Sequence, residues 1–364
     1  MYQEPSGVRI MAYTTIDDPS AYFQTALWSG NDSTQSIVND GNSDMQPDWV
    51  WIKRRTGTAI NHLLYDSTRG ATKNLTITTS DEGTRADGLT AFDSDGFTLG
   101  AGGGENSSGN TFVGWQWQAN GGTRTTFTES GSNPGGGRQV NTTAGFSLID
   151  YTGTGSNGTI AHGLGATPNL VIIKNRDGGN SDSWFTHWTD LLASDAHILY
   201  MNNNDAETSN ATAFNSTAPT STNITVGTNS GTNKDGDNYI CYAFKNIQGY
   251  SKIGTYTGNG SSTNGTFVYT GFKPAFILWK QYNTSGSNWG LRDIERGPFN
   301  PTNDKLMADS TAAETEDWSL DLLSNGFKWY DGGGATNQGS ATYVYWAIAH
   351  QPFVSSEGVP TTAQ

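Results

Sequence analysis

Three segments of this chain repeat one pattern: a proline, an uninterrupted run of apolar or aromatic residues, and a lysine six positions after the proline. They read QPDWVWIK (46–53), TPNLVIIK (167–174) and KPAFILWK (273–280). An aromatic residue with a small turn precedes each segment, and a second aromatic strand follows it. Successive segments lie about one small domain apart, roughly 100–120 residues, whereas solenoid repeats run to about 20–50 residues. The spacing therefore predicts three homologous units in tandem.

The composition indicates that these units are all-β. The 46 glycines separate stretches rich in Thr, Tyr, Val, Ile and Trp, which favour strands. The VWI, VII and ILW runs lack period-2 alternation, so both faces of that strand should be covered. A hydrophobic content of 34% favours three small cores over a single large one. We expect three tandem homologous antiparallel β-sandwich domains of jelly-roll or lectin-like kind.

Repeat matching and composition shifts indicate the domain boundaries. A stretch rich in Gly and Ser after the first repeat is typical of a flexible linker or long loop. The second and third repeats follow with almost no spacer, which predicts that they pack rigidly together. The predicted organisation is an N-terminal arm (1–20), repeat 1 (21–118), the linker or loop (119–140), repeat 2 (141–249), repeat 3 (250–354) and a C-terminal tail (355–364).

The charge balance and the single cysteine narrow the classes of partner and compartment. The formal net charge is −14, from 20 Lys and Arg against 34 Asp and Glu. This argues against nucleic acid, which needs a basic footprint, and against anionic membrane surfaces. No run approaches 18 apolar residues, so no membrane insertion is expected. Cys241 lies within YICYAF and cannot form an intrachain disulfide, which fits synthesis in a reducing cytoplasm.

Motifs for catalysis or metal binding give only weak signals. GTGSNG (153–158) has the spacing of a dinucleotide fingerprint, but no helix is expected after it, so a β turn is favoured. DSDG (93–96) and DGD (235–237) lack the closing acid of a calcium loop. The five histidines show no metal-ligand spacing, and there is no GxSxG motif. We predict no catalytic residue, cofactor or metal site, although a glycosidase-like carboxylate pair stays open.

A DxxRG motif follows the recurring lysine in the first and third repeats. It reads DSTRG (66–70) and DIERG (293–297), at the same distance from the lysine, and the second repeat lacks it. One interpretation is an Asp–Arg pair that fixes a turn ending in glycine. The other is a polar contact at a domain or subunit interface. The residues predicted to have a structural or interface role are Pro47, Lys53, Asp66, Arg69, Pro168, Lys174, Pro274, Lys280, Asp293 and Arg296.

The 12 tryptophans raise the alternative of carbohydrate binding, since sugars stack on exposed aromatic rings. Most of these residues fall in the recurring strands, where packing in a core is the default. The remaining tryptophans are less constrained by the repeat and could reach a surface. The candidate glycan contacts are Trp184, Trp188, Trp289, Trp318 and Trp329.

Segments spread over residues 12–353 resemble a family of β-repeat virion structural proteins from tailed bacteriophages, many of them marine. The resemblance rests on MQPDWVWIKRR, YDSTRGATK, FDSDGFTLG, GFSLIDYTGTGSNGTIAHGLGATP, YSKIGTYTGNG, FVYTGFKPAF and LDLLSNGFK. It implies a non-enzymatic component of the tail, a fibre or a capsid decoration, made in the host cytoplasm and located in the virion. It implies partners among other virion proteins and copies of the chain itself. No catalytic residue is carried over, and the second repeat departs from the pattern at DxxRG.

Two alternatives from other classes stay open. A carbohydrate-binding adhesin or receptor-binding module would bind a host-surface glycan through exposed rings. A polysaccharide-degrading enzyme would need paired carboxylates in a groove. The leading hypothesis is a virion component that acts in particle assembly, with host attachment as an additional role.

Overall fold

The computed structural model describes residues 12–179 and 181–362, in which antiparallel β-strands are the dominant elements. The prediction of an all-β chain is confirmed. The helices within the described residues are single turns: η1 (Pro19–Ala21), α1 (Gly103–Asn106) and α2 (Ser230–Asn233). None of these described helices is long and apolar enough to cross a bilayer.

The strands fall into three sets, which we call units 1, 2 and 3. Unit 1 has a six-stranded sheet in the order β1-β9-β3-β4-β5-β6 and a three-stranded sheet in the order β2-β8-β7. Its strands are β1 (Phe23–Ser29), β2 (Gln35–Ile37), β3 (Trp49–Arg54), β4 (Leu63–Asp66), β5 (Lys73–Thr76), β6 (Gly83–Thr84), β7 (Leu89–Phe92), β8 (Phe97–Leu99) and β9 (Thr111–Trp117).

Unit 2 has an eight-stranded sheet in the order β10-β11-β12-β19-β14-β15-β16-β17 and a two-stranded sheet of β13 and β18. Its strands are β10 (Thr125–Phe127), β11 (Gly136–Asn141), β12 (Phe146–Thr152), β13 (Gly158–Ala161), β14 (Leu170–Asn175), β15 (Trp184–Trp188), β16 (His197–Tyr200), β17 (Thr208–Ser209), β18 (Asn223–Val226) and β19 (Asn238–Phe244).

Unit 3 is a nearly closed barrel of eight strands in the order β20-β27-β22-β23-β24-β25-β26-β21. Its strands are β20 (Ser251–Thr257), β21 (Phe267–Tyr269), β22 (Phe272–Gln281), β23 (Gly290–Asp293), β24 (Thr302–Met307), β25 (Thr315–Leu323), β26 (Gly326–Trp329) and β27 (Thr342–Pro352). The sequence predicted a third sandwich with two separate sheets. Strand β25 is long enough, at nine residues, to pair with both β24 and β26, and this joins the layers.

The main sheets of the three units share one strand order. In units 1, 2 and 3, respectively, β1, β12 and β20 pair with the closing strand (β9, β19 and β27), which pairs with the strand of the repeated lysine (β3, β14 and β22), and three later strands follow in sequence order. Unit 2 adds β11 and β10 beyond β12, and unit 3 adds β26 and β21 at the opposite end. The cross-strand register is the same as well, as the pairs Trp51–Trp115, Ile172–Tyr242 and Leu278–Trp346 show. Corresponding residues of the units can therefore be compared directly by register.

The strand with the repeated lysine is buried on both faces in all three units, as its unbroken apolar run predicted. Every residue of β14 and β22 is buried, and so are all residues of β3 except Arg54. Pro47 and Pro168 lie just before their strands, where no ladder donor is needed. Pro274 instead lies inside β22, and the β22–β27 register shifts on both sides of it. A bulge there accommodates the missing N–H.

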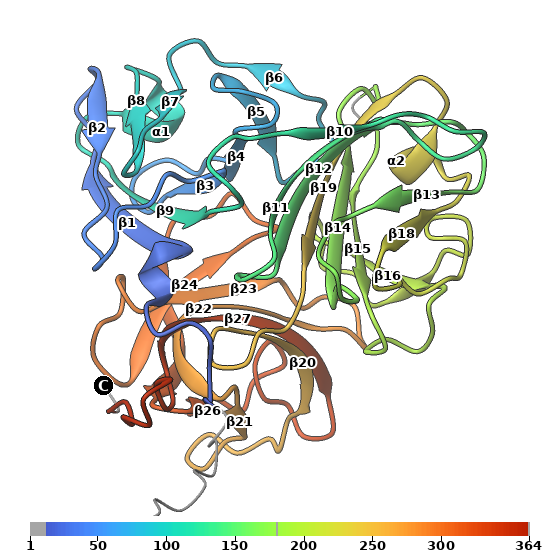
Figure 1. Ribbon diagram of the computed structural model, residues 1–364. Helices are drawn as coiled ribbons and strands as arrows, with labels where there is room; N and C mark the ends of the chain where they lie inside the picture. Colours follow the sequence, from blue (N-terminus) through green and yellow to red (C-terminus); the bar gives the residue numbers. More distant parts are fainter. Residues whose placement is uncertain (1–11, 180, 363–364) are drawn as a thin grey trace, which may run out of the picture.

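The three units close on one another around a shared hydrophobic core (Figure 1). Trp49 of unit 1 stacks on Tyr242 of unit 2 with ring centroids 4.5 Å apart. Phe244 of unit 2 meets Trp346 of unit 3 at 4.3 Å. The expectation of separate small cores holds only in part. Units 1 and 2 each have a hydrophobic cluster of their own, but the largest cluster is shared, because aromatic residues of the three main sheets face one another at the centre.

The predicted linker and terminal segments are partly structured. Residues 119–140 contain β10 and most of β11, and β11 pairs with β12 along its whole length. The described part of the predicted N-terminal arm contacts unit 3, where the Tyr13 hydroxyl donates to the Gly271 carbonyl at 2.8 Å. The rest of that arm (1–11) and the last residues of the predicted tail (363–364) lie outside the described residues.

Candidate functional site

The recurring lysines bridge neighbouring units. Each Nζ donates to a backbone carbonyl oxygen of another unit. These bonds are Lys174 to Thr79 (3.2 Å), Lys280 to Asn204 (3.2 Å) and Lys53 to Thr311 (2.8 Å). Unit 2 thus contacts unit 1, unit 3 contacts unit 2, and unit 1 contacts unit 3, which closes a ring. We call the three contact regions junction 1–2, junction 2–3 and junction 3–1.

Each lysine also donates to a carbonyl of its own unit, so that it ties two loops together. These acceptors are Ile60, Asp182 and Ser287, each at 2.6 Å. The lysines are at most 1% exposed. Burial lowers the pKa of Lys53, Lys174 and Lys280 to about 8. The partners of the buried ammonium groups are carbonyl dipoles, which hold both sides of each junction.

A second set of contacts repeats around the ring at the start of β4, β15 and β23. In each unit an aromatic ring N–H donates to a carbonyl of the neighbouring unit. The bonds are Trp184 to Thr76 (2.8 Å), Trp289 to Tyr200 (2.9 Å) and His62 to Met307 (2.9 Å).

His62 can replace an indole in this position because it is held neutral. Its Nδ1 accepts a hydrogen bond from Trp51 Nε1 at 2.8 Å, so the ring proton lies on Nε2, the donor to Met307. Burial lowers the pKa of His62 well below its usual value. The imidazole therefore serves as a fixed donor and not as a titrating group near neutral pH.

Junction 1–2 contains a buried ionic network that begins at the first DxxRG motif. Asp66 accepts hydrogen bonds from the backbone N–H and the Nε of Arg69, and neither side chain of this pair is exposed. Arg69 continues to Glu82 (Nη1–Oε2, 3.3 Å), and Glu82 pairs with Arg176 of unit 2 (Nε–Oε2, 2.8 Å). Burial by itself would lower the pKa of Arg69, but the negative charge of Asp66 outweighs this effect and raises the pKa. The pair therefore fixes a turn and also reaches across the junction.

Junction 3–1 contains the same network, built from the second DxxRG motif. Asp293 accepts from the backbone N–H and Nε of Arg296, again with no exposure of either side chain. Arg296 pairs with Glu314 (Nη1–Oε2, 2.8 Å), and Glu314 pairs with Arg55 of unit 1 (Nη2–Oε1, 2.7 Å). The order Asp–Arg–Glu–Arg is thus identical at both junctions.

Junction 2–3 has an aromatic contact in place of this network. Strand register and spacing show which residues replace the ionic ones here. Trp188 replaces Asp66, Leu191 replaces Arg69, and Tyr282 replaces Arg176. Trp188 stacks on Trp289 of unit 3 with centroids 5.9 Å apart. One backbone hydrogen bond is common to all three junctions. The Glu82 N–H donates to the Arg176 carbonyl (3.0 Å), the Glu314 N–H to the Arg55 carbonyl (2.8 Å), and the Glu207 N–H to the Tyr282 carbonyl (2.8 Å).

The carboxylates of both DxxRG motifs also accept a hydrogen bond from the closing strand of the next unit. Tyr242 Oη donates to Asp66 Oδ2, and Trp115 Nε1 donates to Asp293 Oδ2, both at 2.9 Å. The corresponding residue of unit 3 is Trp346. Within the described part of the chain its buried Nε1 has no hydrogen-bond partner. The missing carboxylate at position 188 accounts for this unpaired donor.

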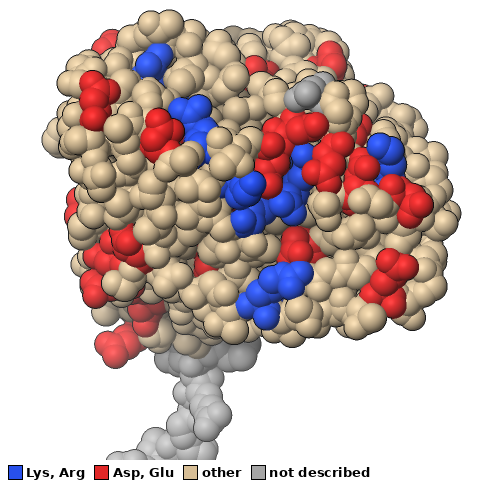
Figure 2. All heavy atoms as spheres, turned by 90° about the horizontal axis from the view of Figure 1, so that it is seen from above, with Lys and Arg blue, Asp and Glu red and all other residues tan. Residues whose placement is uncertain are grey.

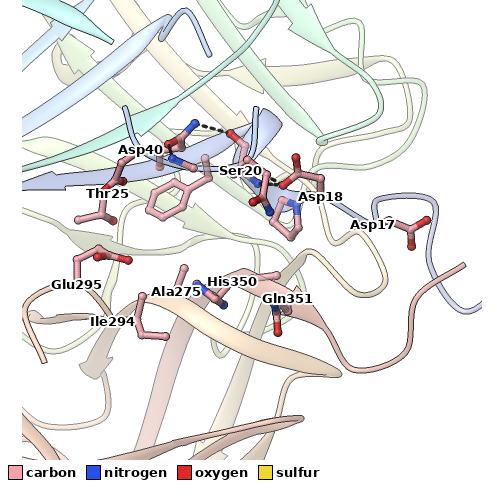
Figure 3. Close-up of a pocket in the computed structure, with 16 residues that line it drawn as sticks. Asp17, Asp18, Ser20, Thr25, Asp40, Ala275, Ile294, Glu295, His350 and Gln351 are labelled. Atoms are coloured by element: carbon pink, nitrogen blue, oxygen red, sulfur yellow. Dashed lines mark hydrogen bonds between the residues drawn. The ribbon is translucent and has the colours of Figure 1, made fainter. Parts of the chain in front are cut away.

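A pocket of about 380 Å³ opens at junction 3–1, between β1 and unit 3 (Figure 3). Thr25 and Asp40 lie on one side of it, and Glu295 and His350 lie on the other. Burial and the charge of Asp40 raise the pKa of Glu295, whereas burial lowers the pKa of His350. The side chains of Asp18, Asp40 and Glu295 give the pocket an acidic lining, which suits a cationic group. No cluster of three metal-ligating side chains occurs among the described residues.

Four of the five tryptophans considered as glycan contacts are not available to a sugar in this structure. Trp184, Trp188, Trp289 and Trp329 are at most 2% exposed, because they line the junctions and the barrel interior. Trp318 is partly buried, with Lys305 Nζ 4.5 Å from its ring centroid. The premise that these rings reach a surface was wrong for the first four.

Sequence reasoning missed the outer half of the ionic networks. Arg55 and Arg176 each stand two residues after the recurring lysine, as KRR and KNR, whereas unit 3 has KQY. This difference matches the presence of the networks and could have been noticed. Glu82 and Glu314 lie at unequal distances from their motifs and left no such signal.

Charges of both signs lie side by side on the face that is seen from above. There, Lys and Arg gather beside Asp and Glu near the centre of the view (Figure 2).

The chain belongs to the family described as Domain of unknown function (DUF7483), whose model matches residues 18–352. The match includes all three units and all three junctions. No curated protein matches the chain. A role must therefore be argued from the ring and its surface.

Proposed function

We propose that this chain is a non-enzymatic structural protein of a bacteriophage virion, placed in the tail, a fibre or a capsid decoration, where it acts in particle assembly. The support comes from the sequence resemblance together with one structural observation. That observation is the use of every recurring lysine and both DxxRG pairs in contacts between units. The recurring polar residues hold the ring together and do not line a reaction cleft.

The ring also suits the mechanical demands of a particle. Cooperative burial of charge across junctions 1–2 and 3–1 penalises partial opening, because an opened junction leaves unpaired ions. In this proposal the units are three homologous sandwich modules, the third of them closed into a barrel. The partners are other virion proteins and further copies of the chain.

Host attachment through glycans is the second role in this proposal. Burial of four of the five candidate tryptophans removes most of the aromatic stacking surface that first suggested this role. A glycan would have to be bound through polar groups such as those of the pocket at junction 3–1. Glycan-array binding by the purified chain tests this role separately.

Labelling of intact particles tests the structural role. Antibodies raised against the purified chain should bind density-purified phage particles at regular positions in electron micrographs. An antibody against a replication protein of the same phage serves as the control and should not bind. Recovery of the chain only from the particle-free fraction of infected cells would contradict the proposal, as would turnover of bacterial surface polysaccharide.

A further inference from the structure

Strand β1 ends the main sheet of unit 1 and has a free backbone edge. The Gln118 N–H donates to the Tyr22 carbonyl, so even-numbered residues of this stretch face β9. Because hydrogen-bonding direction alternates along a strand, Phe23, Thr25 and Leu27 direct their N–H and C=O groups away from β9. No group among the described residues pairs with these N–H and C=O groups.

In unit 2 the equivalent edge is covered by a strand, and in unit 3 the position equivalent to Thr25 is covered by a side chain. By strand register, Leu148 of β12 and Ile253 of β20 correspond to Thr25. Leu148 pairs with Gln139 of β11. Ile253 donates its N–H to Asn246 Oδ1 (2.6 Å) and accepts from Asn246 Nδ2 (3.2 Å), so one amide side chain takes the place of a strand. Unit 1 is the unit in which this position lacks a described partner.

Thr25 is a largely buried residue of this free edge. The residue is 9% exposed, and its Oγ1 is buried without a partner among the described residues. Buried polar groups are usually hydrogen-bonded. Thr25 lines the pocket at junction 3–1, with Glu295 on the opposite side (Figure 3). The unpaired backbone edge of β1 and the unpaired hydroxyl of Thr25 therefore both lie at the pocket of junction 3–1.

Junction 1–2 shows what occupies the same place when a strand is present. There, Gln139 Nε2 donates to Ser67 Oγ (2.9 Å) and Thr68 Oγ1 (2.7 Å) of the first DxxRG motif. In the second motif the corresponding residues are Ile294 and Glu295. A residue paired with Thr25 would therefore direct its side chain toward a carboxylate, where junction 1–2 has hydroxyls.

We propose that the edge of β1 is a docking site for an extended segment of a partner protein, which adds antiparallel to β1 and places a Lys or Arg side chain in the pocket. The main-chain groups of β1 supply affinity and register, and the pocket supplies specificity, as in other cases of strand addition. Glu295 and Asp40 would pair with the cation. The exposed side chain of Leu27 (40%), which lies two residues after Thr25 on β1, extends this surface.

Charge complementarity favours a cationic residue over a neutral one. Asp18, Asp40 and Glu295 all line the pocket. Glu295 forms no ion pair within the described part of the chain, unlike the carboxylates of the two networks. A peptide explains more of the site than a small cation does, since a small cation would leave the backbone groups of β1 unpaired. The inference does not depend on the proposed virion role.

A synthetic peptide tests this site with the intact protein. The probe copies residues 135–142, GGGRQVNT, with lysine in place of Gln139, and carries a fluorophore. We expect saturable binding in fluorescence anisotropy, weakened about tenfold by Glu295→Gln. Glu357→Gln, at an exposed carboxylate of the tail, is the matched control and should leave binding unchanged.

Two further measurements keep the test independent of variant folding. A peptide with glutamate at the same position, or with an N-methyl group on the lysine backbone nitrogen, should bind at least about tenfold more weakly. Amide hydrogen exchange at Thr25 and Leu27 should slow when the lysine peptide binds the wild-type protein. Equal binding of the lysine and glutamate peptides would overturn the proposal. So would protection confined to Leu148, or concentration-dependent pairing of the chain itself through β1.

Discussion

Junctions 1–2 and 2–3 hold their units together by different means on the same frame. Both have a lysine bound to carbonyls of two units, an indole N–H bound to a carbonyl, and a backbone bond from a glutamate. Junction 1–2 adds four charged side chains in a row, whereas junction 2–3 adds the stacked rings of Trp188 and Trp289. The contacts common to all three junctions are thus those made to backbone carbonyls.

The contacts to backbone carbonyls close the ring at every junction, whereas the ionic network and the aromatic stack are alternative ways of packing the space beside them. Backbone carbonyls are present whatever the sequence, so a lysine and a ring N–H suffice to fix the geometry of each junction. The space beside them accepts either a satisfied ionic network or an apolar stack, because the two can be close in stability. A junction that keeps the indole donor without the carboxylate leaves a buried N–H unpaired, as at Trp346, and such a group is expected to cost stability.

The largest effect should follow the loss of one member of a buried network. Asp66→Ala leaves Arg69 without its main partner and removes the acceptor of Tyr242. We expect the free energy of unfolding to fall by about 3–5 kcal/mol, measured by denaturant titration. Asp293→Ala should match it at junction 3–1, while the exposed Glu357→Ala should stay within about 0.5 kcal/mol. Equal stability of Asp66→Ala and Glu357→Ala would mean that the network does not hold the junction.

The lysines should have equal effects at all three junctions, and those effects should depend on pH. Burial lowers the pKa of Lys280 to about 8, against about 10.4 in the unfolded chain. Between these pH values the unfolded chain holds a proton that the folded chain has released, so stability rises with pH. Each lysine contributes at most about 1.4 kcal/mol per pH unit.

The difference between wild type and Lys280→Met isolates this effect. Other groups titrate in the same range, including Arg292, whose pKa burial lowers to about 9. We expect the variant to show a shallower rise in unfolding free energy between pH 8 and pH 10 than the wild type. Lys53→Met and Lys174→Met should behave alike. A slope that differs among the three variants would show that the junctions are not equivalent in their common contacts.

The sequence predicted the local pieces of this ring better than their arrangement. Unbroken apolar runs and glycine turns are local signals, and they located the doubly covered strands and the Asp–Arg pairs. Ring closure depends on contacts such as Lys53 to Thr311, which join residues 258 positions apart. A repeating pattern in the sequence gives no information on which distant residues form such a hydrogen bond. The free edge of β1 was equally hidden, because it follows from the absence of a strand that unit 2 has.

Trp115 and Trp346 provide a smaller, matched comparison of the two kinds of junction. Both are fully buried at the same register position, but only Trp115 donates to a carboxylate. Trp115→Phe and Trp346→Phe remove similar ring volume, so their difference reports the hydrogen bond. We expect Trp115→Phe to cost about 1.5 kcal/mol more in unfolding free energy. Equal losses would indicate that Asp293 gains nothing from the indole.

The smallest expected effect concerns the glutamates that end each network. Glu82 is bound by Arg69 and Arg176, whereas the Glu207 carboxylate accepts only from the Ala193 N–H among the described residues. Glu82→Gln should cost about 1 kcal/mol, since its side chain is partly exposed and water can replace part of the pairing. Glu207→Gln should change stability by less than about 0.5 kcal/mol. High salt should narrow the difference by screening the Glu82 pairs. If Glu207→Gln proved the more costly change, junction 2–3 would depend on a charge after all, and the division between ionic and aromatic junctions would fail.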